Sequence, residues 1–425
     1  MLVNNCNKRK DLEAKLENLL LSKLGTFFKE RSCFRMKEDL LNNSKQLEFP
    51  REILTTISLG LSSVNFLCGN TKGAIRILKQ ALKINPNNPK INWKLGSLYL
   101  KNLELTEAIN YLQEAAKLGN RDPEYVLGLS IAYDYAGQKN IAYDLAEEVL
   151  ERRPESPEAW CIKGKIQAEN QQLAKALQYY NIALEIDDRN LYALNEKGCL
   201  LLKMNRILDG IETFNTALEI QPKDTNLLLN IGLAYIKLEN YESALNFLSK
   251  AKKYKLDTSM LYNALGICYF HLDEMELAKE NYLRAMELEP NNSEILCNLA
   301  AINAQLGKYN LSLDSYKKAI QLDPYNGTVL NNAAWCLEKI GNQEEAIKYY
   351  YRALAVDAQN GAYRINLAEC LYQAGYIQEA IDQLEFLVEK EDSNRKAWGI
   401  LGSIYDSLRQ YSKAIDCHNK ALGLE

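Results

Sequence analysis

Asparagine side chains recur at a fixed interval in the second half of this 425-residue chain. Asn230, Asn298, Asn332 and Asn366 are separated by multiples of 34 residues, and Asn263 lies one residue before a place that the same spacing assigns. A carboxamide offers two N–H donors and an acceptor oxygen, so a row of them can bracket backbone groups of an extended peptide. The chemistry that this pattern predicts is recognition. The alternative is a solvated helix face that tolerates asparagine.

Residues that carry catalysis or bind metals are scarce. The chain has two histidines, and its ten cysteines form no CxxC pair, so neither zinc binding nor histidine-dependent catalysis is predicted. It also lacks a glycine-rich phosphate loop and the GxSxG and HExxH motifs. Cys268, Cys336 and Cys370 occupy equivalent places in their repeats, and we interpret them as buried packing residues in a reducing compartment. No catalytic residue, metal site or cofactor is predicted.

The asparagines lie within a 34-residue repeat that begins at Thr55 and keeps its register to the end of the sequence. In the repeat Ser259–Asn292, one apolar stripe at helical spacing runs over Tyr262–Tyr269 and a second over Ala278–Ala285. Pro290 ends the second stripe, because proline lacks a backbone N–H and disfavours helix in the residue before it. Each repeat therefore predicts two helices, and pairs must stack to bury their stripes.

Small residues at equivalent positions of successive repeats support this 34-residue register. The eighth position of successive repeats is always Gly, Ala or Ser: Ser62, Gly96, Ser130, Gly164, Gly198, Gly232, Gly266, Ala300, Ala334, Ala368 and Gly402. The twentieth position is equally restricted: Ala74, Ala108, Ala142, Ala176, Gly210, Ala244, Ala278, Ser312, Ala346, Ala380 and Ala414. Small residues at these positions predict a close approach of the two helices in each repeat.

This pattern resembles the tetratricopeptide repeat, a 34-residue helix–turn–helix. The resemblance implies an all-α fold, a right-handed α-solenoid or superhelix of about eleven such repeats. It also implies that the first helix of each repeat lines a concave groove, in which positions 2, 5, 6, 9, 12 and 13 face a ligand.

The predicted organisation is one elongated array with an N-terminal addition. Residues 1–54 lie outside the register and include an amphipathic helical pattern, which predicts a capping segment. A separate docking or dimerisation helix is the alternative. The predicted repeats cover residues 55–88, 89–122, 123–156, 157–190, 191–224, 225–258, 259–292, 293–326, 327–360, 361–394 and 395–425.

The resemblance places the candidate peptide-binding residues on the concave groove: Asn230, Asn263, Asn298, Asn332, Asn366 and Trp335. The asparagines are similar to the ladder in the repeat domain of O-linked N-acetylglucosamine transferase. Trp335 could anchor a ligand side chain, since aromatic residues dominate binding hot spots. Packing between neighbouring helices is the alternative for this tryptophan.

A second candidate site is electrostatic. Residues 1–103 carry a net charge of +10 and residues 104–425 a net charge of −14, within an overall charge of −4. Lys90, Lys94 and Lys101 fall at groove positions of one repeat and predict a basic patch for an acidic peptide or a terminal carboxylate. A solvated basic face is the alternative. The chaperone-tail clamp of the family is not matched, because no three consecutive repeats have its residues.

We interpret the chain as a non-enzymatic scaffold or adaptor that binds a protein or peptide along its concave groove. The alternatives are a regulatory or substrate-recruiting part of a larger enzyme, an RNA-binding solenoid, and head-to-tail assembly through the basic start and acidic end. The acidic balance disfavours nucleic acid. The sequence has no run of about 18 apolar residues and no visible signal peptide. We therefore expect a cytoplasmic location and no membrane insertion. Self-association through an uncapped last repeat is also predicted.

Overall fold

A computed structural model of the chain describes residues 51–424, with side chains from Thr55 onward. Twenty-two helices and no strand occur in this range, which confirms the predicted all-α fold. The helices are α3 (Arg51–Leu67), α4 (Thr71–Ile84), α5 (Pro89–Lys101), α6 (Leu105–Leu118), α7 (Pro123–Tyr135), α8 (Lys139–Arg152), α9 (Pro157–Glu169), α10 (Leu173–Ile186), α11 (Leu191–Lys203), α12 (Ile207–Ile220), α13 (Thr225–Lys237), α14 (Tyr241–Lys253), α15 (Ser259–His271), α16 (Met275–Leu288), α17 (Ser293–Gln305), α18 (Tyr309–Leu322), α19 (Gly327–Ile340), α20 (Gln343–Val356), α21 (Gly361–Gln373), α22 (Ile377–Lys390), α23 (Arg395–Ser407) and α24 (Tyr411–Leu422).

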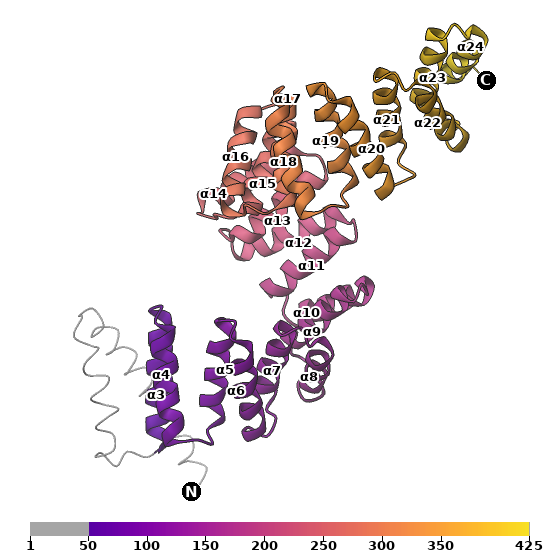
Figure 1. Ribbon diagram of the computed structural model, residues 1–425. Helices are drawn as coiled ribbons and strands as arrows, with labels where there is room; N and C mark the ends of the chain where they lie inside the picture. The colour runs from indigo at the N-terminus through magenta and orange to yellow at the C-terminus, as the bar shows by residue number, and fades with distance from the viewer. Residues whose placement is uncertain (1–50, 425) are drawn as a thin grey trace. The chain divides into compact units, whose positions relative to one another are not determined.

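The chain divides into two compact units, with the boundary between Leu200 and Leu201 inside α11. Within each unit, an odd-numbered helix packs most extensively on the even-numbered helix that follows it, as α5 does on α6 and α19 on α20 (Figure 1). From α5 to α23, each odd-numbered helix begins at the first residue of a predicted repeat. The exception is α3, which begins at Arg51, the residue after Pro50, rather than at Thr55. Residues 1–50 of the predicted capping segment lie outside the described residues.

A capping side chain precedes each first helix from α5 to α23. The last residue of every repeat accepts a hydrogen bond from a backbone N–H in the first turn of the next helix, which satisfies a donor that has no partner within the helix. The capping residues are Asn88, Asp122, Ser156, Asn190, Asp224, Thr258, Asn292, Asn326, Asn360 and Asn394. This column explains why the helix starts keep the 34-residue interval.

The turn within each repeat requires a left-handed residue at position 15. Five repeats supply glycine there, as at Gly137, where φ is +77°. The other repeats hold a non-glycine residue with positive φ at the same place: Leu103, Gln171, Asn205, Glu239, Asp273 and Arg409. The turn geometry is therefore set by the packing of the two helices, and it is imposed even on residues that disfavour it.

Close approach of the two helices depends on the small residue at position 8. A Cβ added at Gly232 would lie 2.5 Å from the Leu248 side chain, and one at Gly266 would lie 2.6 Å from the Tyr282 ring. Leu248 and Tyr282 occupy the same position in their second helices and are buried. The large residue at position 24 thus fills the space that the small residue at position 8 leaves.

Two serines in the small columns add a hydrogen bond across the same contact, whereas the Ser62 hydroxyl donates to the Leu59 carbonyl of its own helix. The Ser130 hydroxyl of α7 donates to the Ala142 carbonyl of α8 at 2.7 Å. In a later repeat the direction is reversed, and the Ser312 hydroxyl of α18 donates to the Ala300 carbonyl of α17 at 2.8 Å. The hydroxyl can therefore replace a methyl at this contact because a backbone carbonyl of the facing helix lies within its reach.

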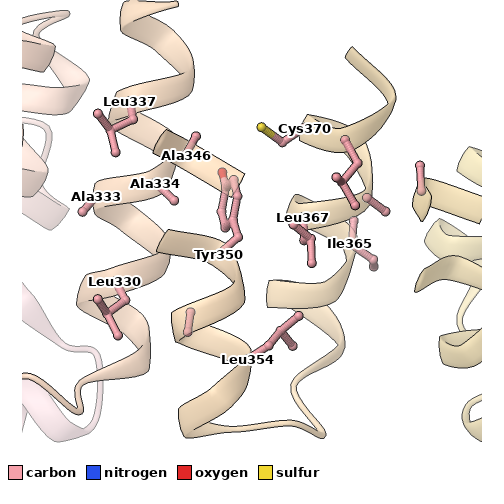
Figure 2. Packing of buried hydrophobic residues seen from close by; sticks show 14 of the residues in the cluster. Leu330, Ala333, Ala334, Leu337, Ala346, Tyr350, Leu354, Ile365, Leu367 and Cys370 are labelled. Carbon is pink, nitrogen blue, oxygen red and sulfur yellow. The ribbon is translucent and has the colours of Figure 1, made fainter. Parts of the chain in front are cut away.

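The stacked repeats share continuous apolar cores. Figure 2 shows Tyr350 of α20 between Ala334 of α19 and Leu367 of α21, and all three side chains are fully buried. Tyr350 thus closes its own repeat and meets the first helix of the next one. Cys370 belongs to the same apolar cluster, in agreement with its interpretation as a packing residue.

We predict that Gly266→Ala destabilises the chain although alanine favours helix. The added methyl would overlap the buried Tyr282 ring, a cost of about 1–3 kcal/mol, against a helix gain of about 0.5–1 kcal/mol. Gly60→Ala is the matched control in α3, since no atom of a described residue lies within 4 Å of its added Cβ. Thermal melting by circular dichroism should show a lower transition for the first variant and a higher one for the second. Equal stabilisation by both would contradict the close approach.

Candidate functional site

The first helices form the inner side of each compact unit. In the second unit α13 contacts α15, α15 contacts α17, α19 contacts α21, and α21 contacts α23, whereas consecutive second helices of the described chain make no contact of comparable extent. In the first unit α3, α5, α7 and α9 contact one another in the same way. Each stack therefore bends toward its first helices. We call the exposed side of these helices the inner face.

Two asparagine pairs join neighbouring first helices on the inner face. Asn298 of α17 donates from Nδ2 to Oδ1 of Asn263 on α15, at 2.9 Å. Asn366 of α21 donates from Nδ2 to Oδ1 of Asn331 on α19, at 3.0 Å. Each pair spans 35 residues, so the bond runs from position 5 of one repeat to position 6 of the next. The structure thus joins Asn298 directly to Asn263, whereas Asn366 is joined to Asn331, which was not among the predicted binding residues.

One asparagine of each pair also donates a hydrogen bond to a further side chain. Asn263 donates from Nδ2 to Glu294 of α17 at 2.8 Å, so its carboxamide is held between Glu294 and Asn298. Asn331 donates to Oδ1 of Asn332, at 3.3 Å. We call Asn263, Asn298, Asn331, Asn332 and Asn366 the amide column. Their carboxamides are oriented before any ligand arrives.

Asn230 and Trp335 complete the predicted groove residues. Asn230 is partly buried on α13. Trp335 is partly buried on α19, where it packs against the apolar cluster of the second unit and meets the Tyr309 ring edge-on at 5.7 Å between centroids. Lys339 places its Nζ 5.4 Å from the same ring. Part of the Trp335 side chain serves packing, as the alternative interpretation required, and part remains accessible beside the amide column.

An apolar row accompanies the amide column, and of its five residues sequence reasoning predicted Trp335 and missed the other four. It consists of partly exposed side chains at positions 9 and 12 of the first helices: Ile267, Phe270, Ala301, Trp335 and Tyr372. The signal was available, since these residues recur at the groove positions that the resemblance implies. Amides and apolar side chains thus share the inner face of the second unit.

The predicted basic patch lies on α5 in the first unit. Lys90 and Lys101 are exposed and Lys94 is partly buried. None of the three forms an ion pair with a residue that the structure describes, although Lys101 places its Nζ 4.4 Å from the centroid of the Phe66 ring. Lys90 and Lys101 are therefore the exposed cations of this patch.

Other charged groups of the first unit are paired with side chains of the same unit. Asp134 is 5% exposed and lies between two ammonium groups, Lys139 at 2.7 Å and Lys165 at 2.6 Å. Lys163 places its Nζ 4.7 Å from the Tyr143 ring and 5.1 Å from the Tyr179 ring. This aromatic cage is thus filled by the chain's own lysine and is not open to a cationic ligand.

No group of three or more metal-ligating side chains occurs among the described residues. No described helix is long and apolar enough to cross a membrane. The cysteines at position 10 are fully buried. Burial raises the pKa of Cys268 to about 12 and that of Cys370 to about 11.

The raised thiol pKa values predict strongly unequal alkylation. With a pKa of about 12, only about one Cys268 thiol in ten thousand is ionised at pH 8, and the thiolate is the reactive form. Cys68, in contrast, is exposed. Peptide-resolved mass spectrometry after brief iodoacetamide treatment should find label at Cys68 and not at Cys268. Comparable labelling of both in the folded chain would show that the repeat core is open. Cys68→Ser provides the control for peptide assignment.

Comparison with known proteins agrees with this geometry. A family model described as the cilia and flagella-associated protein 70 C-terminal domain matches residues 146–398, more than half of the chain. Tetratricopeptide repeat models match residues 69–130 and 396–425. The chain is a tetratricopeptide repeat protein, a class of interaction scaffolds that are in general non-catalytic. Within that class it belongs to the family of the cilia and flagella-associated protein 70 C-terminal domain.

Several solved structures match the chain at low identity. YrrB, a tetratricopeptide protein described as having an unusual peptide-binding site, is 20% identical, with a TM-score of 0.38 over 46% of this chain and 97% of that one. A tetratricopeptide protein from Parabacteroides merdae is 17% identical, with a TM-score of 0.46 over 59% and 98%. PilF from Pseudomonas aeruginosa is 18% identical, with a TM-score of 0.41 over 45% and 88%. No curated protein matches the chain.

Proposed function

We propose that this protein is an interaction scaffold that captures an extended partner segment along the inner face of its second compact unit. The observation that carries the proposal is the pair of inter-helix amide bonds, Asn263–Asn298 and Asn331–Asn366, beside Trp335. In this proposal the amide column reads the backbone of the segment, and the apolar row takes its side chains.

The amide column keeps hydrogen-bonding capacity for a ligand. A carboxamide has two N–H donors and an oxygen with two lone pairs. Asn263 is buried, but its partner Asn298 is partly exposed and donates once, to Asn263, so its second N–H and its carbonyl oxygen are left. A peptide amide can engage these without breaking the existing pair. Because the pairs already fix the carboxamides, less side-chain entropy is lost on binding.

The binding free energy for micromolar affinity requires both the amide column and the apolar row. Four net hydrogen bonds supply about 2–6 kcal/mol, whereas micromolar affinity needs about 8 kcal/mol. Burial of apolar area supplies about 25 cal/mol per Å², so covering about 100–150 Å² of the row adds roughly 3 kcal/mol. The ligand that fits is an extended segment with apolar side chains at alternate positions, since these point to one side of an extended backbone.

The basic patch on α5 supports a separate contact of the same scaffold. Lys90 and Lys101 are exposed and Lys94 is partly so, without carboxylate partners in the described part of the chain. We propose that it receives an acidic segment or a terminal carboxylate. Neutralising Lys90 and Lys94 should weaken such binding mainly at low ionic strength, because exposed charges are screened by salt.

The family description also bears on where the partner is found. We propose that the partner belongs to a cilium or flagellum, because the matching family model takes its description from a cilia- and flagella-associated protein. The earlier expectation of a cytoplasmic location stays a prediction. Expression of a tagged chain in ciliated cells tests the ciliary proposal and the cytoplasmic prediction together. Enrichment along the axoneme or at its base supports the ciliary context. A uniform cytoplasmic signal argues against it.

Removing three carboxamides from the inner face should abolish capture. We predict that Asn298→Ala, Asn332→Ala and Asn366→Ala together weaken binding about 10- to 100-fold, which corresponds to roughly 1.4–2.8 kcal/mol. The probes are proteome-derived peptides displayed on phage, selected on the wild-type chain and then measured by titration calorimetry.

The matched control carries the same change on second helices. Asn215→Ala, Asn246→Ala and Asn310→Ala remove three exposed carboxamides from α12, α14 and α18. This variant should bind the selected peptides as the wild type does. Thermal melting of both variants separates lost binding from lost folding. Unchanged affinity in the first variant would refute the role of the amide column.

A further inference from the structure

The exposed surface of α4 is entirely cationic. The exposed residues of this helix are Lys72, Arg76, Lys79 and Lys83, spaced by four, three and four residues, which is one helical face. None of them forms an ion pair with a described residue, and no Asp or Glu occurs from Ile53 to Leu103. Lys79 alone has a ring partner, with its Nζ 5.4 Å from the Tyr99 centroid. We call these four residues the basic ridge.

The exposed surface of α22 is mainly acidic, although Gln378 and Phe386 are exposed on it as well. Glu379, Asp382, Glu385 and Glu389 are exposed along this helix, and Lys390 at its end is its one exposed cation. Asp382 accepts a hydrogen bond from Gln378, and Glu385 accepts one from the Tyr405 hydroxyl at 2.7 Å. None of the four carboxylates is in an ion pair within the described range. We call them the acidic ridge.

The two ridges match in length and in number of charges. At 1.5 Å per residue, the basic ridge extends about 16 Å from Lys72 to Lys83 and the acidic ridge about 15 Å from Glu379 to Glu389. Both lie on second helices, away from the inner face. A ridge of four like charges is self-repelling, and a complementary ridge relieves that repulsion while steering encounter.

We propose that the basic ridge of one copy of this chain docks on the acidic ridge of a second copy. The contact joins two different surfaces, so it is heterologous and leaves one ridge of each kind free at the ends of a pair. Further copies add at those ends, which gives an open chain of molecules. The inner face stays uncovered, so this assembly is independent of the peptide capture proposed above.

Sedimentation velocity of the full-length chain tests the proposal. At about 10 mM salt, where the Debye length is about 30 Å, the weight-average sedimentation coefficient should rise with protein concentration. At about 150 mM salt, where it is about 8 Å, the rise should diminish strongly. Replacement of the four basic-ridge residues by Glu, or of the four acidic-ridge residues by Lys, should each abolish association.

Mixing the two charge-reversed variants decides the pairing. Each variant alone presents like charges on both ridges, whereas a mixture restores one wild-type contact and one swapped contact. Association should therefore return in the equimolar mixture. The control reverses an equal number of exposed lysines near the end of α14, Lys250, Lys252, Lys253 and Lys255, and should associate as the wild type does.

Three results would overturn the proposal. The first is a concentration-independent monomer at low salt. The second is association of both charge-reversed variants at wild-type strength, which would assign self-association to another surface such as the exposed apolar side of α24, where Ile415 is 59% and Leu422 is 68% exposed. The third is failure of the mixture to associate while both variants keep the wild-type melting transition, since the two ridges then do not pair.

Discussion

The structure depends on one close contact, repeated along the chain, between a small residue in the first helix of a repeat and a large one in the second. Gly232 faces Leu248, Gly266 faces Tyr282, and Ala334 faces Tyr350 in this way. A larger residue at the small position would force the helices apart, and interiors at native packing density do not absorb such a change. The left-handed turns follow, because the helices can meet only if the residue between them adopts positive φ.

The same contact determines the geometry of the proposed binding surface. With each helix pair held at a fixed separation, successive first helices approach closely enough for asparagines 35 residues apart to share hydrogen bonds. The inner face then presents oriented amides beside an apolar row, and the second helices carry exposed charge. The proposed capture of a partner segment and the proposed assembly of copies would therefore use opposite sides of the repeats.

Sequence periodicity was sufficient for the architecture, because packing columns repeat with the chain. The starts of α5 through α23 and the buried position-10 cysteines followed from the 34-residue frame. It did not predict the partners of the asparagines. The frame aligned position 6 with position 6, whereas the bonds run diagonally from position 5 to position 6, which depends on helix tilt. The Asp134 ion cluster was missed for a similar reason, since its members come from three helices and from unrelated columns.

The central claim is that the first helices of the second compact unit form the binding surface. Hydrogen–deuterium exchange of the chain with and without a peptide selected by display measures this directly. The account predicts that added protection falls on α15, α17, α19 and α21, with α16, α18 and α20 unchanged. Protection confined to those second helices, at saturating peptide, would contradict it.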